Sequence, residues 1–417
     1  MCRVPYARLI GMGKPPRSAA LDLWHRWVLT CMRRASFVRV RSGGAVPGPR
    51  RRPRLIVSSH RNGAIDGALV QSAFPHAQYL VSMQLLRGPL RLLFTGIPVI
   101  RQRDVERYGM DRSSVNDPVS AGVDHLRAGG DLVIFPEGTS EWQHTAGAYQ
   151  RGAAKIVCRL QEAGVDVDVI PVGLFYLAPE RFGTMAELWC GPDVDLPPDT
   201  DGPRIEREKR AHAILSEALD AVSVHCPDPQ TFDIVQRRAT DRARAGESFA
   251  ASFLDEQAAA VPGMAGTAVA DGGPAAGSAV SAEPVTASGP ASAATAAPSP
   301  WPRRLGIALH WLFAPVLLAG WFAGTKADAR NTVTFFRSLG GSAGVVIWLV
   351  LVVVGGVWMT LAGAGATAAA VAGAGVVSAV LGRLILRARR WQPDTAPMDT
   401  GLLNSAARDA AQNTELT

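Results

Sequence analysis

Residues 55–67 read LIVSSHRNGAIDG and combine a short apolar run, a turn and two titratable side chains. The β-branched run at 55–57 is typical of a buried strand in a parallel sheet. The Asn-Gly pair at 62–63 indicates a turn after that strand. Because ligand sites in open α/β sheets lie just beyond the carboxyl ends of strands, the sequence predicts a functional site around His60 and Asp66.

His60 and Asp66 are the residue types that general-base catalysis requires. An imidazole can take a proton from an attacking hydroxyl, while a carboxylate orients the ring and stabilises the imidazolium that forms. Such a pair also arises by chance, and a histidine at this position can equally pack in a core or cap a helix. The pair therefore needs support from other parts of the chain.

Three further blocks follow in order: GIPVIRQRD at 96–104, FPEGTS at 135–140 and VIPV at 169–172. Together with the first block they resemble the four motifs of the glycerophospholipid acyltransferase superfamily, which includes the glycerol-phosphate and lysophosphatidate acyltransferases. The resemblance covers roughly residues 37–231, and FPEGTS is its most specific part. It implies an enzyme that transfers acyl groups.

The first block departs from the common pattern of that superfamily. Five residues separate His60 from Asp66, where most members have four. The longer spacing resembles the HxNxxxD form of a branch that includes fungal-type glycerol-phosphate acyltransferases. The stretch TKADARNTVTFFRSL at 325–339 is similar to a segment that follows the acyltransferase domain in the same branch. Both features favour that branch.

The resemblance also implies roles for particular residues. His60 would be the base and Asp66 its orienting carboxylate. An arginine of the second block would bind the phosphate of the acceptor. Alternation along an extended segment places Arg101 and Arg103 on one face, and Arg103 ranks first because it precedes Asp104 as the basic residue of the motif does. The alternative is that both are surface charges.

The FPEGTS block supplies three more substrate-binding candidates. Gly138 permits a tight turn, Thr139 can donate a hydrogen bond, and Glu137 can fix the loop or the acceptor. A purely structural turn is the alternative for this block. In the fourth block, Pro171 is expected to shape an acyl pocket.

The expected fold class is α/β, with a mainly parallel sheet, helices on both faces, and a C-terminal helical membrane region. Strands are expected at 37–40, 55–58, 79–82, 97–100, 131–135, 167–175 and 187–190. Helical patterns cover 19–34, 119–128, 148–163, 205–222 and 230–244.

Composition, together with the resemblance for the acyltransferase domain, predicts the domain boundaries. They are a basic arm with an amphipathic helix at 1–36, an acyltransferase domain at 37–250, an Ala/Gly/Ser/Pro linker at 251–301, a membrane region at 302–391 and a polar tail at 392–417. Since all four motif blocks precede the linker, a chain without residues 301–417 is expected to keep some transfer activity.

The membrane region contains three apolar segments, at 305–323, 345–361 and 367–386, each long enough to cross a hydrocarbon core. All flanking basic clusters stay cytoplasmic if the first segment re-enters at Pro315 and the other two form a hairpin, so the hairpin is preferred over three spans. Glycines at 363, 365, 373 and 375 are expected to allow close helix packing.

The N-terminal part carries most of the positive charge. Residues 1–54 hold thirteen Lys or Arg and one acidic residue, Asp22, which suits nucleic acid or an anionic phospholipid membrane. The apolar segments elsewhere favour the membrane and argue against nucleic acid. Trp24, Val28 and their neighbours form one apolar side of a helix at 19–34, which would lie in the interface, pack on the domain, or both.

Cofactors and metals are not expected. The five cysteines lack metal-ligand spacing and indicate reduced thiols, and neither a P-loop nor a dinucleotide-binding turn occurs. The resemblance implies an acyl donor thioester, acyl-CoA or acyl-carrier protein, and a phosphorylated glycerol acceptor. The apolar segments and their flanking charges predict a location at the cell membrane, and the reduced cysteines favour a catalytic domain on the cytoplasmic face.

Two functions remain open. The first is a membrane-bound O-acyltransferase that moves a fatty acyl group to glycerol 3-phosphate or lysophosphatidate in phospholipid biosynthesis. The second is a catalytically inactive, membrane-tethered lipid-binding protein with the same fold. The joint presence of His60, Asp66 and Glu137 favours the enzyme. The sequence leaves the acceptor, the acyl chain length and the oligomeric state open.

Overall fold

The computed structural model describes residues 19–86, 88–100, 105, 117–196, 202–260, 301–327 and 329–389. The chain forms two compact units. The first consists of residues 1–270 and 313–370, and the second of residues 271–312 and 371–417. The predicted site residues that the structure describes belong to the first unit.

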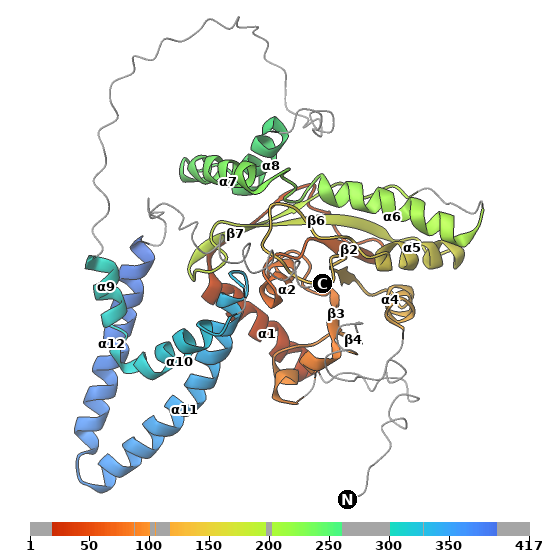
Figure 1. Cartoon of the computed structure of the whole chain (residues 1–417). Coiled ribbons are helices and arrows are strands. Elements are labelled where there is room, and N and C mark those ends of the chain that lie inside the picture. The colour runs from red at the N-terminus through yellow and green to blue at the C-terminus, as the bar shows by residue number, and fades with distance from the viewer. Residues whose placement is uncertain are drawn as a thin grey trace, which may run out of the picture. The chain divides into compact units, whose positions relative to one another are not determined.

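A seven-stranded sheet is the centre of the first unit (Figure 1). Its strands are β1 (Phe37–Gly44), β2 (Arg54–Ser58), β3 (Gln78–Ser82), β4 (Ile97–Val99), β5 (Leu132–Ile134), β6 (Asp168–Tyr176) and β7 (Thr184–Cys190). Their order is β1-β7-β6-β2-β5-β3-β4, and every neighbouring pair is parallel except β6 and β7. The predicted mainly parallel sheet is confirmed.

Helices cover both faces of this sheet because successive strand residues point to opposite sides. In β2, Leu55 and Val57 belong to one apolar core and Ile56 to another. The first core includes residues of α4 (Pro118–Arg127), α5 (Gly152–Glu162) and α6 (Arg204–Asp220), and the second includes residues of α2 (Ala64–Val70). Helices on both faces, as predicted, are therefore confirmed.

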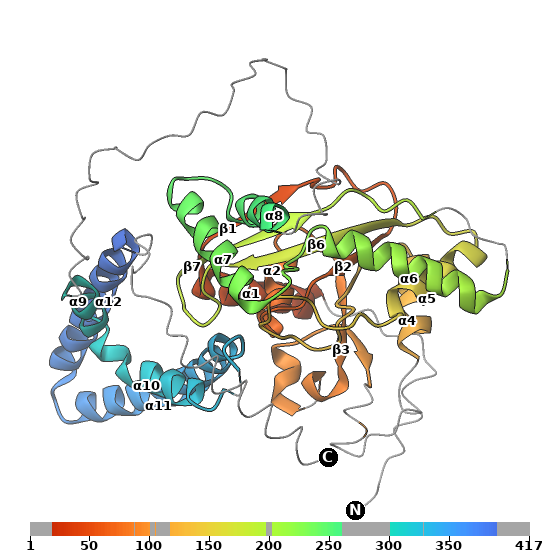
Figure 2. The same ribbon diagram turned by 45° about the horizontal axis from the view of Figure 1, so that its top comes forward.

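Two further helices, α7 (Pro229–Arg244) and α8 (Phe249–Ala260), lie across β6 and β7 (Figure 2). Residues 251–260 were expected to begin the linker, but they form most of α8. The reason is the spacing of Phe249 and Phe253, which lie one turn apart, pack with ring centroids 6.2 Å apart and are fully buried. The Ala-rich composition concealed this apolar face.

The N-terminal helix α1 (Ala19–Ser36) packs on the domain through His25 and Val28, which are buried. Leu23, Trp24 and Trp27 stay exposed, so the predicted apolar side is only partly covered by the domain. Of the two arrangements that the sequence left open, the structure shows the packing. The exposed rings are available to a membrane interface, which stays a prediction.

Among the described residues, two helices near the C-terminus are long and apolar enough to cross a membrane by length and composition, Val333–Leu361 and Gly365–Leu386. They belong to α11 (Val333–Leu361) and α12 (Gly365–Arg389). The first of the three predicted apolar segments, 305–323, is not one continuous helix. It is divided among α9 (Trp301–Ala308), η5 (Trp311–Phe313) and α10 (Ala314–Gly324). The choice between a hairpin and three spans stays a prediction.

Glycines do permit close helix packing, but mostly not the predicted ones. In the first unit, a Cβ built on Gly340 would lie 2.3 Å from the Cβ of Ala323, so α10 and α11 approach closely there. In the second unit, a Cβ on Gly382 would lie 2.6 Å from the carbonyl oxygen of Gly306. Of the four glycines predicted for such packing, a Cβ built at 375 would lie 2.5 Å from Leu312 and one at 365 would lie 3.4 Å from Thr360 of α11. A Cβ built at 363 or 373 would meet nothing within 4 Å.

Candidate active site

Two loops meet at one edge of the sheet because β2 and β5 are adjacent and parallel. His60 follows the carboxyl end of β2, and Glu137 follows the carboxyl end of β5. The backbone N–H of His60 donates a hydrogen bond to Oε1 of Glu137 over 2.7 Å. The structure thus brings together the first and third sequence blocks, as expected for a site at the strand ends.

His60 and Asp66 form a direct pair. Nδ1 of His60 lies 2.8 Å from Oδ2 of Asp66, and Asp66 is in the first turn of α2. Gly63 precedes this helix with φ of +55°, a conformation in which a Cβ atom would be strained, so the turn favours glycine. The pairing occupies Nδ1 and leaves Nε2 of a partly exposed ring for a substrate proton.

Asp66 is fully buried, and hydrogen bonds compensate the cost of burying its carboxylate. Oδ2 accepts from the backbone N–H groups of Arg61 and Asn62, each over 2.8 Å. Oδ1 accepts from the hydroxyl of Tyr176. Burial, followed by the adjacent carboxylate, raises the pKa of Tyr176 well above its usual value, so the hydroxyl keeps its proton. These bonds hold Asp66 in the orientation that positions the His60 ring.

Aromatic and cationic side chains surround the pair. The ring of Phe135 stacks on His60 with centroids 4.4 Å apart and 22° between planes. Arg61 is buried, its guanidinium lies 4.6 Å from the Trp142 ring centroid, and Nη2 donates to the carbonyl of Gln143 over 2.9 Å. Burial lowers the pKa of Arg61 to about 10, and the Glu137 and Asp66 carboxylates oppose that change, so Arg61 stays cationic at neutral pH.

In this structure, the Glu137 carboxylate accepts two hydrogen bonds from the backbone of the surrounding loops. Its Oε1 accepts from His60, and its Oε2 accepts from the backbone N–H of Gly147 over 3.3 Å. Burial raises the pKa of Glu137, and these two hydrogen bonds partly offset the rise. Gly138 has φ of +70°, which favours glycine for a steric reason, and Thr139 is half-buried beside it. Loop fixing is thus the role that the observed contacts support for Glu137.

Arg101 and Arg103 lie outside the described residues, so their predicted role in phosphate binding stays a prediction. Strand β4, which precedes them, ends at Val99. It is parallel to β3, and β3 is parallel to β5, so β4 ends at the same edge of the sheet as β2.

Three residues at the site were not predicted: Arg61, Tyr176 and Asn331. Nδ2 of Asn331 donates to the carbonyl of Arg61 over 2.9 Å and to that of Ser140 over 3.2 Å. The similarity of residues 325–339 to a segment of one acyltransferase branch was a usable signal for Asn331. No sequence motif points to Tyr176 or Arg61. Their contacts, with Asp66 and with the Trp142–Gln143 loop respectively, depend on which strands are neighbours in the sheet.

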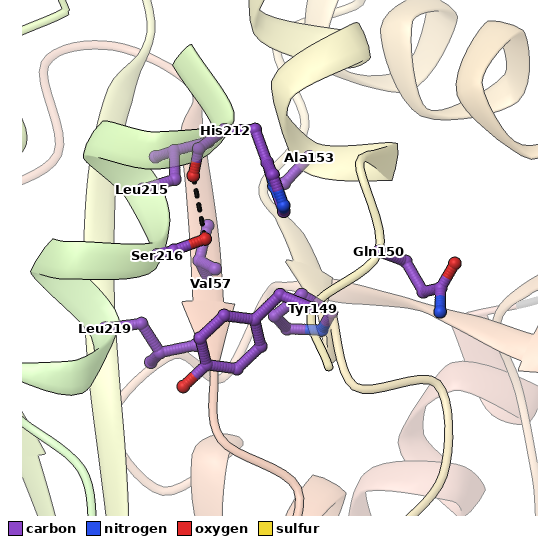
Figure 3. A pocket seen from close by; sticks show the side chains of 9 residues that line it. Val57, Tyr149, Gln150, Ala153, His212, Leu215, Ser216 and Leu219 are labelled. Carbon is purple, nitrogen blue, oxygen red and sulfur yellow. Dashed lines mark hydrogen bonds between the residues drawn. The ribbon is translucent and has the colours of Figure 1, made fainter. Parts of the chain in front are cut away.

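A separate small cavity lies between α5 and α6, on the face of β2 that carries Val57 (Figure 3). Tyr149, His212 and Ser216 line it, and Ser216 Oγ donates to the carbonyl of His212 over 2.8 Å. His60 is not among its lining residues. This cavity is therefore distinct from the His60–Asp66 pair.

Among the described residues, no three His, Cys, Asp or Glu side chains form a group that could hold a metal ion.

Comparisons with known proteins agree with the geometry. The model of the Acyltransferase family matches residues 39–174. The chain is 27% identical over 121 residues to glycerol-3-phosphate O-acyltransferase 1 of Saccharomyces cerevisiae, and the match covers 27% of this chain and 16% of the yeast protein. The chain thus matches only a small part of that relative's length.

A solved structure is also similar, the crystal structure of the 1-acyl-sn-glycerophosphate acyltransferase PlsC from Thermotoga maritima. The two chains are 18% identical, with a TM-score of 0.33, over 48% of this chain and 77% of PlsC. The family match contains His60, Asp66 and the Glu137 loop. Residues 39–174 thus contain an Acyltransferase domain, and the family match together with the yeast relative supports the glycerophospholipid acyltransferase superfamily.

Proposed function

We propose that this protein is a membrane-bound O-acyltransferase of phospholipid biosynthesis. It would move a fatty acyl group from a thioester, acyl-CoA or acyl-carrier protein, to glycerol 3-phosphate or lysophosphatidate. The observation that carries the proposal is the His60–Asp66 pair, with Nδ1 and Oδ2 2.8 Å apart at the strand ends of a domain that matches the Acyltransferase family.

The reaction follows from that pair. Nε2 of His60 takes the proton of the acceptor hydroxyl as its oxygen attacks the thioester carbonyl. A carbon–oxygen bond forms, the carbon–sulfur bond breaks, and the proton passes to the leaving thiolate. Asp66 holds the ring and stabilises its charged form, and general-base catalysis of this kind contributes about 10²–10⁴-fold.

Glycerol 3-phosphate is the preferred acceptor in this proposal. Two observations support it: the five-residue spacing between His60 and Asp66, and the similarity to a yeast protein named as a glycerol-3-phosphate O-acyltransferase. Arg101 and Arg103 would bind the phosphate, since planar guanidinium groups suit bidentate phosphate contacts. They follow a strand that ends at the same edge of the sheet as β2.

The proposed location is the cell membrane, with the catalytic domain on the cytoplasmic face. Helix α11 and residues 365–386 are long and apolar enough to span it. Trp24 and Trp27 on α1 are exposed, and tryptophan is favoured at membrane interfaces. The basic residues near the N-terminus would add attraction to anionic lipid.

A direct assay tests the proposal and separates it from an inactive lipid-binding protein. Purified full-length protein receives one labelled acyl-CoA and a panel of phosphorylated acceptors, and released CoA is measured. We expect release only when a glycerol phosphate acceptor is present, and release about 10²–10⁴-fold slower from His60→Ala. The assay is repeated with acyl-carrier protein as donor. Lipid binding without turnover on either donor would favour the lipid-binding protein instead.

A further inference from the structure

We propose that residues 329–337, here called the clamp segment, position the two active-site loops, with Asn331 as the positioning residue. The segment comes directly before the long apolar part of α11 and overlaps its first turn. Its kinetic test rests on the proposed function, whereas its structural test does not.

Asn331 connects both loops with one amide group. Its Nδ2 donates to the carbonyl of Arg61, which is 270 positions away in the sequence, and to the carbonyl of Ser140. The Asn331 side chain is fully buried. Since buried backbone carbonyls require hydrogen-bond partners, loss of this amide would remove a donor from the buried carbonyl of Arg61 and from the partly buried carbonyl of Ser140.

The two carbonyls belong to residues next to the backbone contact between the His60 loop and the Glu137 loop. Arg61 follows His60 directly, and its N–H already donates to Asp66, so both its N–H and its carbonyl are held. Ser140 precedes Glu141, whose N–H donates to the carbonyl of His60 over 3.3 Å. Asn331 therefore fixes the backbone on both sides of the contact between the loops.

An ion pair attaches the clamp segment to the domain. Nε and Nη2 of Arg330 donate to the two carboxylate oxygens of Glu180 over 2.9 and 3.1 Å. This bidentate geometry is the strong form of such a pair. The hydroxyl of Thr334 donates to the carbonyl of Pro179, and Nη1 of Arg337 donates to that of Glu180 over 3.3 Å. The loop after β6 thus holds the segment in register.

Aromatic contacts extend the same attachment. The ring of Phe335 packs against Phe94 with centroids 6.0 Å apart. The Arg330 guanidinium lies 6.0 Å from the centroid of Trp142, the same ring that contacts Arg61. The clamp segment therefore contacts the active-site surroundings at several independent points.

This arrangement replaces one expectation from the sequence. The four motif blocks precede the linker, which predicted that a chain ending at residue 300 would keep some activity. Such a chain lacks Asn331 and with it the amide that holds both loops. The clamp segment at the start of α11 thus helps to position the active-site loops. We therefore expect its loss to lower activity even with an acceptor that is soluble in water.

The kinetic test uses full-length protein with Asn331→Ala and Asn331→Asp, the latter nearly isosteric but unable to donate when ionised. We expect kcat to fall about ten- to a hundredfold, since small misplacements of catalytic groups cost rates of this order, with little change in the KM of either substrate. Ser338→Ala is the matched control, because the Ser338 hydroxyl bonds only within α11, to the carbonyl of Thr334. Unchanged kcat in both Asn331 variants overturns the proposal.

A charge swap keeps the test decisive if the Asn331 variants fold poorly. Arg330→Glu should lower kcat, and the double variant Glu180→Arg, Arg330→Glu should restore at least part of it by re-forming the pair in reverse. A double variant no better than Arg330→Glu, with both proteins folded, would argue against attachment through this pair.

Hydrogen exchange supplies a readout that needs no turnover. In Asn331→Ala we expect faster exchange of amides at 60–62 and 141, with α5 unchanged. Unchanged exchange at these amides, or faster exchange throughout the domain, counts against a positioning role. If the unaltered protein transfers no acyl group to any acceptor, the proposed function fails while the exchange result still decides on the clamp.

Discussion

Tyr176 donates its hydroxyl to Oδ1 of Asp66, the carboxylate oxygen opposite the one that pairs with His60. The tyrosine comes from the end of β6, 110 positions after the aspartate. The orientation of the proposed catalytic base thus depends on a strand that carries none of the catalytic groups.

We expect Tyr176→Phe to lower both stability and kcat. It leaves a buried carboxylate oxygen without a donor, which costs about 1–3 kcal/mol. The Asp66 side chain also gains freedom to rotate, so the His60 ring is less well held. Thermal unfolding and kcat measured on the same preparation test this. The matched control is Tyr79→Phe, whose hydroxyl donates to the carbonyl of Gly67 instead. Equal kcat losses in both variants would contradict a specific role for Tyr176.

His60→Ala is expected to lower kcat by about 10²–10⁴-fold, the usual contribution of a general base, and to leave the protein folded because the ring is partly exposed. Asp66→Asn should also lose most activity, because an amide cannot accept all the hydrogen bonds that the carboxylate does. Turnover and circular dichroism are the measurements. His212→Ala, in the separate cavity, is the control. Near-normal turnover by His60→Ala would mean that the proposed mechanism is wrong.

Glu137 predicts a pH dependence of stability. Burial raises its pKa above the ordinary value of 4.5, so the folded state holds this proton more tightly than the unfolded state. Its contribution to stability is present below pH 4.5 and is lost as the pH rises through the folded pKa. Glu137→Gln cannot ionise, so we expect the melting temperature of the unaltered protein to fall relative to this variant over that window.

The control for this pH dependence is Glu141→Gln, at an exposed carboxylate in the same loop. It should keep the pH dependence that Glu137 gives the unaltered protein. Parallel melting curves for Glu137→Gln and the unaltered protein across the window would show that Glu137 ionises as it does in the unfolded chain.

Arg101→Ala and Arg103→Ala are expected to raise the KM for a glycerol phosphate acceptor more than the KM for the acyl donor. A charge-assisted contact to phosphate contributes roughly 1.5–3 kcal/mol, or about ten- to a hundredfold. Arg127→Ala, at an exposed position of α4, removes a positive charge as a control. Equal effects on both substrates would point to a structural role for the two arginines.

The sheet was predictable because most strands contain a short apolar run with turn residues beside it, as in β2, β4 and β5. The His60–Asp66 pair was predictable for a similar reason, since the two residues are close in sequence and one turn brings them together. The sequence placed His60 and Glu137 after strands that end at one edge of the sheet, but their hydrogen bond is a finding of the structure. Local patterns and one topological rule were sufficient for these features.

The remaining contacts of the site depend on which strands are neighbours, and periodicity does not specify this. Tyr176 reaches Asp66 because β6 is next to β2, and Asn331 reaches Arg61 from a segment beyond the linker. The glycines between helices present the same difficulty. Several glycines fit a close contact by composition, and the register of each helix pair decides which of them, such as Gly340, takes part.

Anchoring by the C-terminal region yields the last prediction. Without residues 301–417, the chain loses both helices that are long and apolar enough to span a membrane. It keeps α1, whose Trp24 and Trp27 rings are exposed and 5.1 Å apart, and the basic residues around it. We therefore expect an integral protein to become a peripheral one that binds anionic vesicles and is released by high salt, because salt screens surface charge.

A second truncation separates anchoring from catalysis. A chain without residues 345–417 also loses the spanning helices but retains the clamp segment, including Asn331 and the Arg330–Glu180 pair. Both truncated proteins are sedimented with vesicles at low and high salt, checked for folding, and assayed with glycerol 3-phosphate. We expect transfer to persist in the longer chain and to fall at least about tenfold further in the shorter one, because only the shorter chain loses the amide that holds the two loops.

Equal transfer by two folded truncations would show that the loops hold their geometry without the clamp segment. A shorter chain that still needs detergent for release would show that the part before the linker contains its own membrane anchor.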